Sequence, residues 1–116
     1  MIEGVLRDAS GQSLVPCVYR ATNSRERMRG LIGRPLSANQ GFWLEPCNSV
    51  HTWFMSYPID VLFLDKHGVI LKMVHELRPW KISAKLRARA TLELFTGSAA
   101  SLGLVEGQKL FWYGTN

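Results

Sequence analysis

The chain has few cysteines and no long hydrophobic run. Its only two cysteines, Cys17 and Cys47, lie too far apart for a metal-binding knuckle and are too few for the disulfide framework of a small secreted protein. We favour a reduced pair, with one disulfide as the alternative. No segment approaches the roughly 20 apolar residues of a membrane-spanning helix, and the first residues lack the apolar core of a signal peptide. We therefore expect a soluble, cytoplasmic protein without a membrane span.

Acidic residues are also scarce: nine Asp and Glu stand against fourteen Lys and Arg, which gives a net charge of +5. Such a charge speeds encounters with anionic partners such as nucleic acid, phospholipid headgroups or an acidic protein. The basic positions Lys85, Arg87 and Arg89 could contact phosphates, as could the arginines near residue 27. Neither segment interleaves aromatic residues as a single-strand-binding platform does. We therefore favour a solvated face over nucleic-acid binding.

What the chain does have is apolar content, at 47% of 116 residues. That amount supplies one hydrophobic core without help from a metal or a disulfide. There is no linker, repeat or low-complexity tract, and glycine and proline are scattered as turn signals. The sequence predicts a single domain over residues 1–116, without a cofactor.

Apolar segments separated by turn signals predict mostly β structure. Pro16 cannot donate to a sheet, so its strand should lie at an edge or begin beyond the proline. The run at 59–64 is suited to burial on both faces, and Asp65 starts the tight turn that follows it. The expected strands cover residues 2–7, 14–21, 41–44, 50–55, 59–64, 69–75 and 108–113.

Two segments have clear periodicity. Asn23 and Glu26 have the spacing of a capping box, which predicts a helix at about residues 24–32 that ends at Gly33 and buries Met28, Leu31 and Ile32. From residue 82 to 94 every even position is apolar, which predicts extended chain with the even side chains inward and a bend near 88–90.

Several short motifs together resemble the domain of unknown function 192 family. The resemblance spans about residues 18–110, and the motifs that carry it include Arg29-Gly-Leu-Ile-Gly-Arg34, Val50-His-Thr-Trp-Phe-Met55, Pro58-Ile-Asp-Val-Leu-Phe-Leu-Asp65 and Leu92-Glu-Leu94. The resemblance implies a small β-sandwich of jelly-roll character with one helix and no established activity, in a family whose members are often exported. One branch of the family has Trp-Met-Lys-Asn-Thr before its Pro-Leu-Asp, whereas here Ser56 follows Met55 directly. With the pattern above, we expect an antiparallel β-sandwich or flattened barrel with one short α-helix.

The first candidate site centres on Asp60. An unpaired carboxylate in so apolar a strand would be costly, so we expect Asp60 to pair with Arg34 or Arg27. Aromatic and thioether side chains lie close to it in the sequence. If some remain exposed, they would form an apolar pocket with convergent polar groups, the usual form of a small-ligand site. The predicted ligand-binding residues are Arg34, His51, Trp53, Met55 and Asp60.

Chemistry at this site is the alternative. Cys47, His51 and Asp60 have the residue types of a thiol nucleophile, its base and an orienting acid. A zinc site needs three or four protein ligands, and the spacing supplies no closing pair, so we predict no metal. Our first hypothesis is a non-enzymatic module that binds a small molecule or a protein segment; the others are an enzyme using Cys47 or His51, and a basic nucleic-acid-associated protein.

Overall fold

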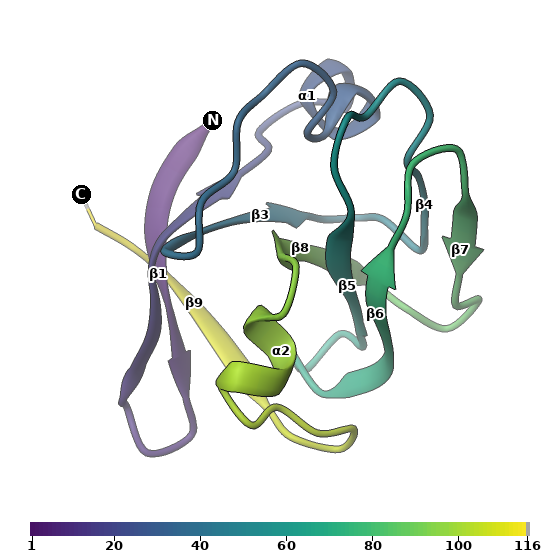
Figure 1. Cartoon of the computed structure of the whole chain (residues 1–116). Helices are drawn as coiled ribbons and strands as arrows, with labels where there is room; N and C mark the ends of the chain where they lie inside the picture. The colour runs from purple at the N-terminus through teal and green to yellow at the C-terminus, as the bar shows by residue number, and fades with distance from the viewer. Residues whose placement is uncertain (116) are drawn as a thin grey trace.

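The computed structural model describes residues 1–115 as a mainly β fold with two short helices (Figure 1). The helices are α1 (Ser24–Arg29) and α2 (Ser98–Ser101). The strands, in chain order, are β1 (Ile2–Asp8), β2 (Ser13–Arg20), β3 (Gln40–Leu44), β4 (Ser49–His51), β5 (Ile59–Leu64), β6 (Ile70–Leu77), β7 (Ile82–Ala84), β8 (Ala90–Phe95) and β9 (Leu110–Gly114). The mainly β prediction is confirmed, with a second helix beyond the one expected.

Seven strands form one sheet in the order β6-β5-β8-β3-β2-β1-β9, and β4 pairs with β7 in a separate two-stranded sheet. Neighbouring strands of the large sheet are antiparallel, except that β2 and β3 are parallel. The parallel pair arises because the segment between them, which carries α1, crosses the sheet and brings the chain back to the same end. The sheet is therefore mixed, with β6 and β9 at its edges.

Strand β2 lies inside the sheet although it contains Pro16. Its pairing with β1 is irregular between Val15 and Val18, and its pairing with β3 begins at Cys17. The proline thus occupies a bulge, where its missing N–H leaves no gap in the hydrogen bonding.

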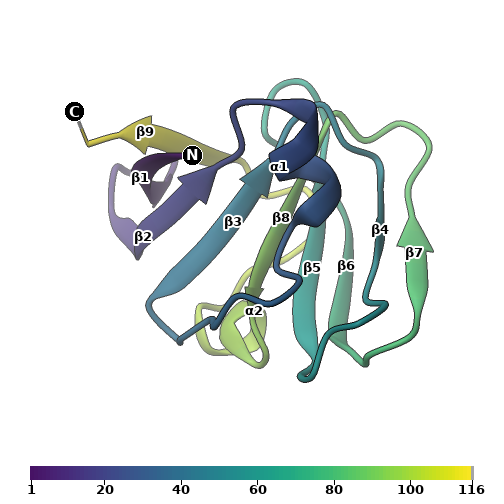
Figure 2. The same ribbon diagram turned by 90° about the horizontal axis from the view of Figure 1, so that it is seen from above.

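The two faces of the large sheet are both buried, so the fold has two hydrophobic clusters. Every residue of β5 is buried, as expected for 59–64, and so are the first five of β8. One cluster, with Leu62, Leu92 and Ala99, packs beneath α2. The other, with Phe42 and Phe63, lies beneath α1 and the β4–β7 pair. Figures 1 and 2 show α1 and α2 on opposite sides of β3, β8 and β5.

Helix α1 starts as expected but ends early. The Asn23 side chain accepts a hydrogen bond from the Glu26 N–H at 2.9 Å, which confirms the N-terminal cap. The helix stops at Gly30, whose φ of 53° breaks it three residues before Gly33. The predicted apolar stripe is wrong at Met28, which is 78% exposed, since the segment that contacts the sheet begins only after the helix.

Two predicted strands are shorter in the structure. Residues 50–55 contribute only the end of β4, and then a turn in which Phe54 has a φ of 67°. The segment 82–94 forms β7, an exposed loop and β8. Its even-inward pattern is wrong for Ile82 and Leu86, which are 68% and 88% exposed, because β7 lies outside the large sheet. The loop between the two strands, residues 85–89, overlaps the bend expected near 88–90 but begins before it.

The turn after β5 is built as predicted. Asp65 accepts hydrogen bonds from the His67 and Val69 N–H groups at 2.7 and 3.0 Å. Gly68 closes it with a φ of 85°, at a place where a Cβ atom would collide with the Leu110 carbonyl. Across residues 1–115, no helix has the length and apolar content that a membrane span requires.

Candidate functional site

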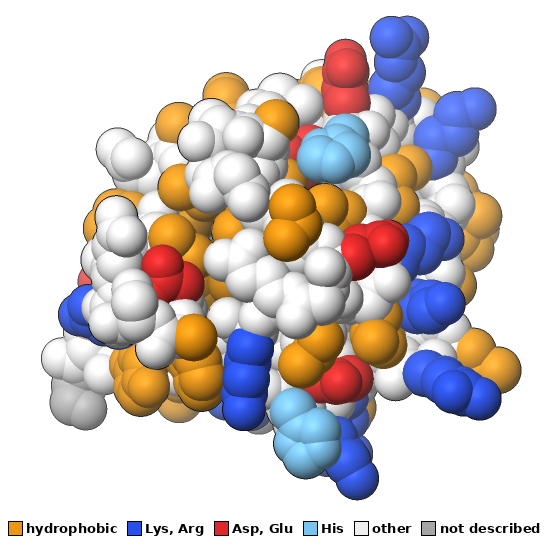
Figure 3. Space-filling view, turned by 90° about the horizontal axis from the view of Figure 1, so that it is seen from below, with side chains coloured by type: hydrophobic (Ala, Val, Ile, Leu, Met, Phe, Trp, Pro, Cys, Tyr) orange, Lys and Arg blue, Asp and Glu red, His pale blue; other side chains and the backbone are white. Residues whose placement is uncertain are grey.

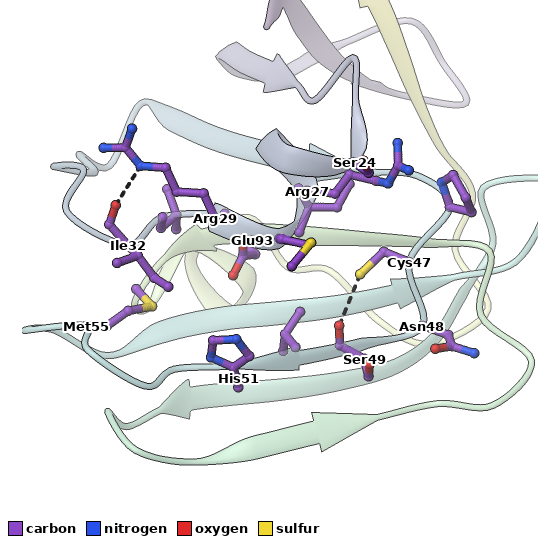
Figure 4. Close-up of a pocket in the computed structure, with 16 residues that line it drawn as sticks. Ser24, Arg27, Arg29, Ile32, Cys47, Asn48, Ser49, His51, Met55 and Glu93 are labelled. Atoms are coloured by element: carbon purple, nitrogen blue, oxygen red, sulfur yellow. Dashed lines mark hydrogen bonds between the residues drawn. The ribbon is translucent and has the colours of Figure 1, made fainter.

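A cavity of about 420 Å³ lies between the end of α1 and strand β4. We call it the α1–β4 cavity. Arg27 and Arg29 line it from α1 and Gly30 from the end of that helix, and Cys47, Ser49 and His51 line it from β4 and the loop before it (Figure 4). Met55 and Glu93 are also among the residues that line it. The cavity is large enough for a small organic molecule.

Glu93 is the functional candidate that the sequence analysis missed. It stands in β8, in the middle of the large sheet, with Phe42 of β3 and Val61 of β5 beside it in register. Both neighbours are fully buried, and Glu93 itself is only 3% exposed. Its Oε1 atom has no hydrogen-bond partner among the described residues. A buried carboxyl without a partner is costly, so this position requires an explanation.

Gly30 allows α1 to end directly over that carboxyl. A Cβ atom on residue 30 would lie 3.3 Å from Oε1 of Glu93 and would have to adopt the same positive φ of 53°. Glycine is therefore needed here both for the turn and for the close approach.

Burial raises the pKa of the Glu93 carboxyl to about 7. The same apolar setting acts on Tyr57, because burial, and then the charge of Glu93, raise the pKa of its phenol. Glu93 can therefore exchange a proton near neutral pH, which is an uncommon property for a carboxyl and one found at functional sites.

His51 is the second polar group of the cavity with an unsatisfied atom. Its Nδ1 is buried and has no hydrogen-bond partner among residues 1–115. The centre of its ring lies 4.8 Å from that of Trp53, with the two rings tilted by 31°, and Trp53 is 45% exposed. Figure 4 shows His51 below Glu93, on the β4 side of the cavity.

The thiol of Cys47 is free and donates to the Ser49 carbonyl oxygen at 3.1 Å. That contact holds the thiol against the backbone, and no hydrogen bond joins it to His51 within the described chain. Cys17, also free, lies on β2.

The predicted ion pair of Asp60 with Arg34 or Arg27 is wrong. Asp60 is 1% exposed and accepts hydrogen bonds from the Glu76 N–H at 2.9 Å and the Ala99 N–H at 3.0 Å. No ion pair in residues 1–115 includes it. The alternation of side chains along β5 turns Asp60 to the α2 face, away from α1. There it supplies the acceptor that helix α2 lacks, since Gly97 at its N-cap has no side chain.

Arg34 lies outside the α1–β4 cavity. Its backbone carbonyl accepts from the Tyr57 hydroxyl at 2.6 Å, and its guanidinium lies 5.8 Å from the Phe42 ring centre. The side chain lines a neighbouring hollow of about 680 Å³, together with Phe54. Met55 borders both hollows.

The structure therefore divides the predicted site. His51 and Met55 line the cavity, and the Trp53 ring contacts that of His51. Arg34 lines the neighbouring hollow, and Asp60 lies on the opposite face of the sheet. The predicted Cys-His-acid arrangement is not assembled, because its acid is sealed beneath α2. No cluster of three or more His, Cys, Asp or Glu side chains within residues 1–115 could hold a metal ion.

The basic positions form no single strand face. Lys85, Arg87 and Arg89 belong to the exposed loop between β7 and β8, and Arg89 lies 3.7 Å from a Glu45 carboxylate oxygen. Figure 3, which views the α2 side, shows Lys and Arg side chains along the edge where β6 and β7 lie.

Comparison with known proteins agrees with the resemblance noted from the sequence. The model of the family DUF192, described as an uncharacterised ACR, matches residues 5–112. The UPF0127 protein PH1112 of Pyrococcus horikoshii is 38% identical over 66 residues, a match that spans 56% of each chain, so little more than half of that relative is covered.

Two crystal structures share the fold. A Sinorhizobium meliloti 1021 protein, proposed to be a transcription regulator, aligns with a TM-score of 0.81 and 22% identity over 96% of this chain and 92% of its own. A protein of unknown function from Novosphingobium aromaticivorans DSM 12444 aligns with a TM-score of 0.75 and 22% identity, over 95% of this chain and 84% of its own. At this identity the likeness concerns the fold alone. The family match covers nearly the whole chain, so the protein belongs to the DUF192 family.

Proposed function

We propose that this DUF192 member is a small binding module, without a catalytic step, whose ligand occupies the α1–β4 cavity. The observation that carries the proposal is the buried Oε1 of Glu93, which faces the cavity and has no partner in the described chain. A ligand that donates a hydrogen bond to this oxygen would remove the cost of burying it.

The rest of the lining supports binding. Leu31, Leu44, Val50 and Met55 give the cavity apolar walls, and His51 adds a second unsatisfied polar atom. Apolar walls with a few convergent polar groups are the usual form of a small-ligand site. The enzyme alternative has less support, because the Cys47 thiol donates to a backbone carbonyl and the expected acid lies on the other face.

A probe titration tests this function. Three four-carbon molecules, butylammonium, n-butanol and butyrate, are each added to the labelled protein while backbone amide NMR signals are recorded. At least one should shift the amides of Gly30, Ser49, His51 and Glu93, which surround the cavity, and leave those of Glu76 and Ala99 on the opposite face unchanged. If no probe shifts the cavity amides selectively, the cavity is not a ligand site.

A further inference from the structure

We propose that the natural ligand of the α1–β4 cavity is a small organic cation: a single primary ammonium group on an apolar stem, which donates to Oε1 of Glu93. This inference rests on the proposed function and names the class of ligand. The inference rests on the charged groups, the unsatisfied polar atoms and the apolar side chains around Glu93.

No charged group in residues 1–115 forms an ion pair with Glu93. The cationic side chains that line the cavity are Arg27 and Arg29 of α1, yet no ion pair within residues 1–115 includes Glu93. Arg29 is engaged elsewhere, since its Nε donates to the Ile32 carbonyl at 3.0 Å. A buried carboxylate without a counter-ion favours a ligand that brings a positive charge.

The ligand's charge should be on nitrogen and not on a metal. Metal ions require several ligand groups, and the described chain offers no cluster of three. A primary ammonium carries three N–H donors, which is enough for Glu93 and for the unpartnered Nδ1 of His51. The apolar walls, among them Leu44 and Val50, would contact the carbon stem.

The mouth of the cavity limits the number of charges. Arg27 is half-buried and Arg29 is exposed, and both are positive. A second positive charge on the ligand would be repelled there, so a monoamine is favoured over a polyamine. By the same reasoning, Arg27 weakens the binding of any cation.

Binding should also depend on pH. The pKa of Glu93 is about 7, so the carboxyl becomes charged as pH rises through neutrality, while an alkylammonium stays protonated to about pH 10. The other titratable or charged groups around the cavity are Arg27 and Arg29 of α1, His51 of β4, Cys47 before it, and Tyr57.

The probe titration provides the test when the three molecules are compared. Butylammonium should bind at least about tenfold more tightly than n-butanol, and butyrate most weakly, because only the amine gains a charged hydrogen bond. Its affinity should rise by about tenfold per pH unit below pH 7 and then level off.

Two variants should change this affinity in opposite directions. Glu93→Gln should weaken butylammonium binding about tenfold or more and remove its pH dependence, whereas Arg27→Ala should strengthen it by a few fold. Far-UV circular dichroism shows whether each variant is folded. Tighter binding of n-butanol or butyrate than of the amine, or an amine affinity unchanged by Glu93→Gln, would overturn the cation while leaving the cavity as a ligand site. Failure of all three probes would overturn both proposals.

Discussion

Asp60 and Glu93 are both almost fully buried and lie on neighbouring strands of one sheet, yet their surroundings are opposite. Asp60 faces α2 and accepts two backbone N–H groups. Glu93 faces α1 and lines the α1–β4 cavity, and its Oε1 has no hydrogen-bond partner in the described part of the chain. On the α2 face, backbone N–H groups of the protein satisfy the buried carboxyl. On the α1 face, the buried carboxyl can still accept a hydrogen bond from a ligand. A satisfied buried carboxyl holds a fold together, and an unsatisfied one marks a site.

The largest expected effect is on the α2 face. Asp60→Asn keeps the size of the side chain but turns an amide N–H₂ toward one of two N–H donors, so the free energy of unfolding should fall by about 4 kcal/mol. For a domain of this size the melting temperature should fall by roughly 15 °C.

Asp65→Asn is the matched control, because Asp65 also accepts two backbone N–H groups, but in a partly exposed turn where water can replace them. It should cost about 1 kcal/mol. Equal effects of the two variants in thermal unfolding would show that burial of Asp60 is unimportant.

On the α1 face, removing the charge of the buried carboxyl should stabilise the protein, whereas Asp60→Asn destabilises it, and the gain in stability should depend on pH. The pKa of Glu93 is raised from 4.5 to about 7 in the folded state, so the folded protein holds a proton that the unfolded chain has lost. Stability is therefore fully present below about pH 4.5 and falls as pH rises through 7. Glu93→Gln should remove this loss and make the protein about 3 kcal/mol more stable than wild type at pH 8. Urea unfolding across this range measures the difference, which should be small at pH 4.5.

Gly30→Ala should have a smaller effect, of about 2 kcal/mol, because alanine is strained at a φ of 53° and its Cβ would crowd Glu93. Gly11→Ala separates the two causes, since Gly11 also has a positive φ, of 87°, but nothing lies within 4 Å of its Cβ position. If both variants lose the same stability in urea, the close approach of α1 to Glu93 contributes nothing.

The smallest effect is expected at Met28. Although the pattern predicted a buried side chain, it is largely exposed, so Met28→Ser should change the free energy of unfolding by less than about 0.5 kcal/mol. Leu31→Ala, in the buried segment just after α1, should cost about 3 kcal/mol. A large loss for Met28→Ser in the same assay would place the helix closer to the sheet.

The sequence predicted the fold better than the site, for a physical reason. Local signals, such as the Asn23 cap and the Asp65 turn, depend on neighbours along the chain and were confirmed. The partner of Asp60 depends on which face of the sheet each helix covers, and sequence spacing does not contain that information. Glu93 looked like an outward residue of an alternating strand, but α1 and the β4–β7 pair cover the face that it occupies. The available signal was Leu92-Glu-Leu94 among the motifs of the family resemblance.

The central claim is that Glu93 is a buried carboxyl whose Oε1 has no hydrogen-bond partner in residues 1–115, and the titration of Glu93 tests this most directly. With ¹³C-labelled glutamate, the side-chain carboxyl signal of Glu93 can be followed against pH in the ligand-free protein, using Glu93→Gln for assignment. We predict a midpoint near pH 7. A midpoint at or below the ordinary glutamate pKa of 4.5 would show that water or a basic side chain already satisfies the carboxylate, and would contradict the claim.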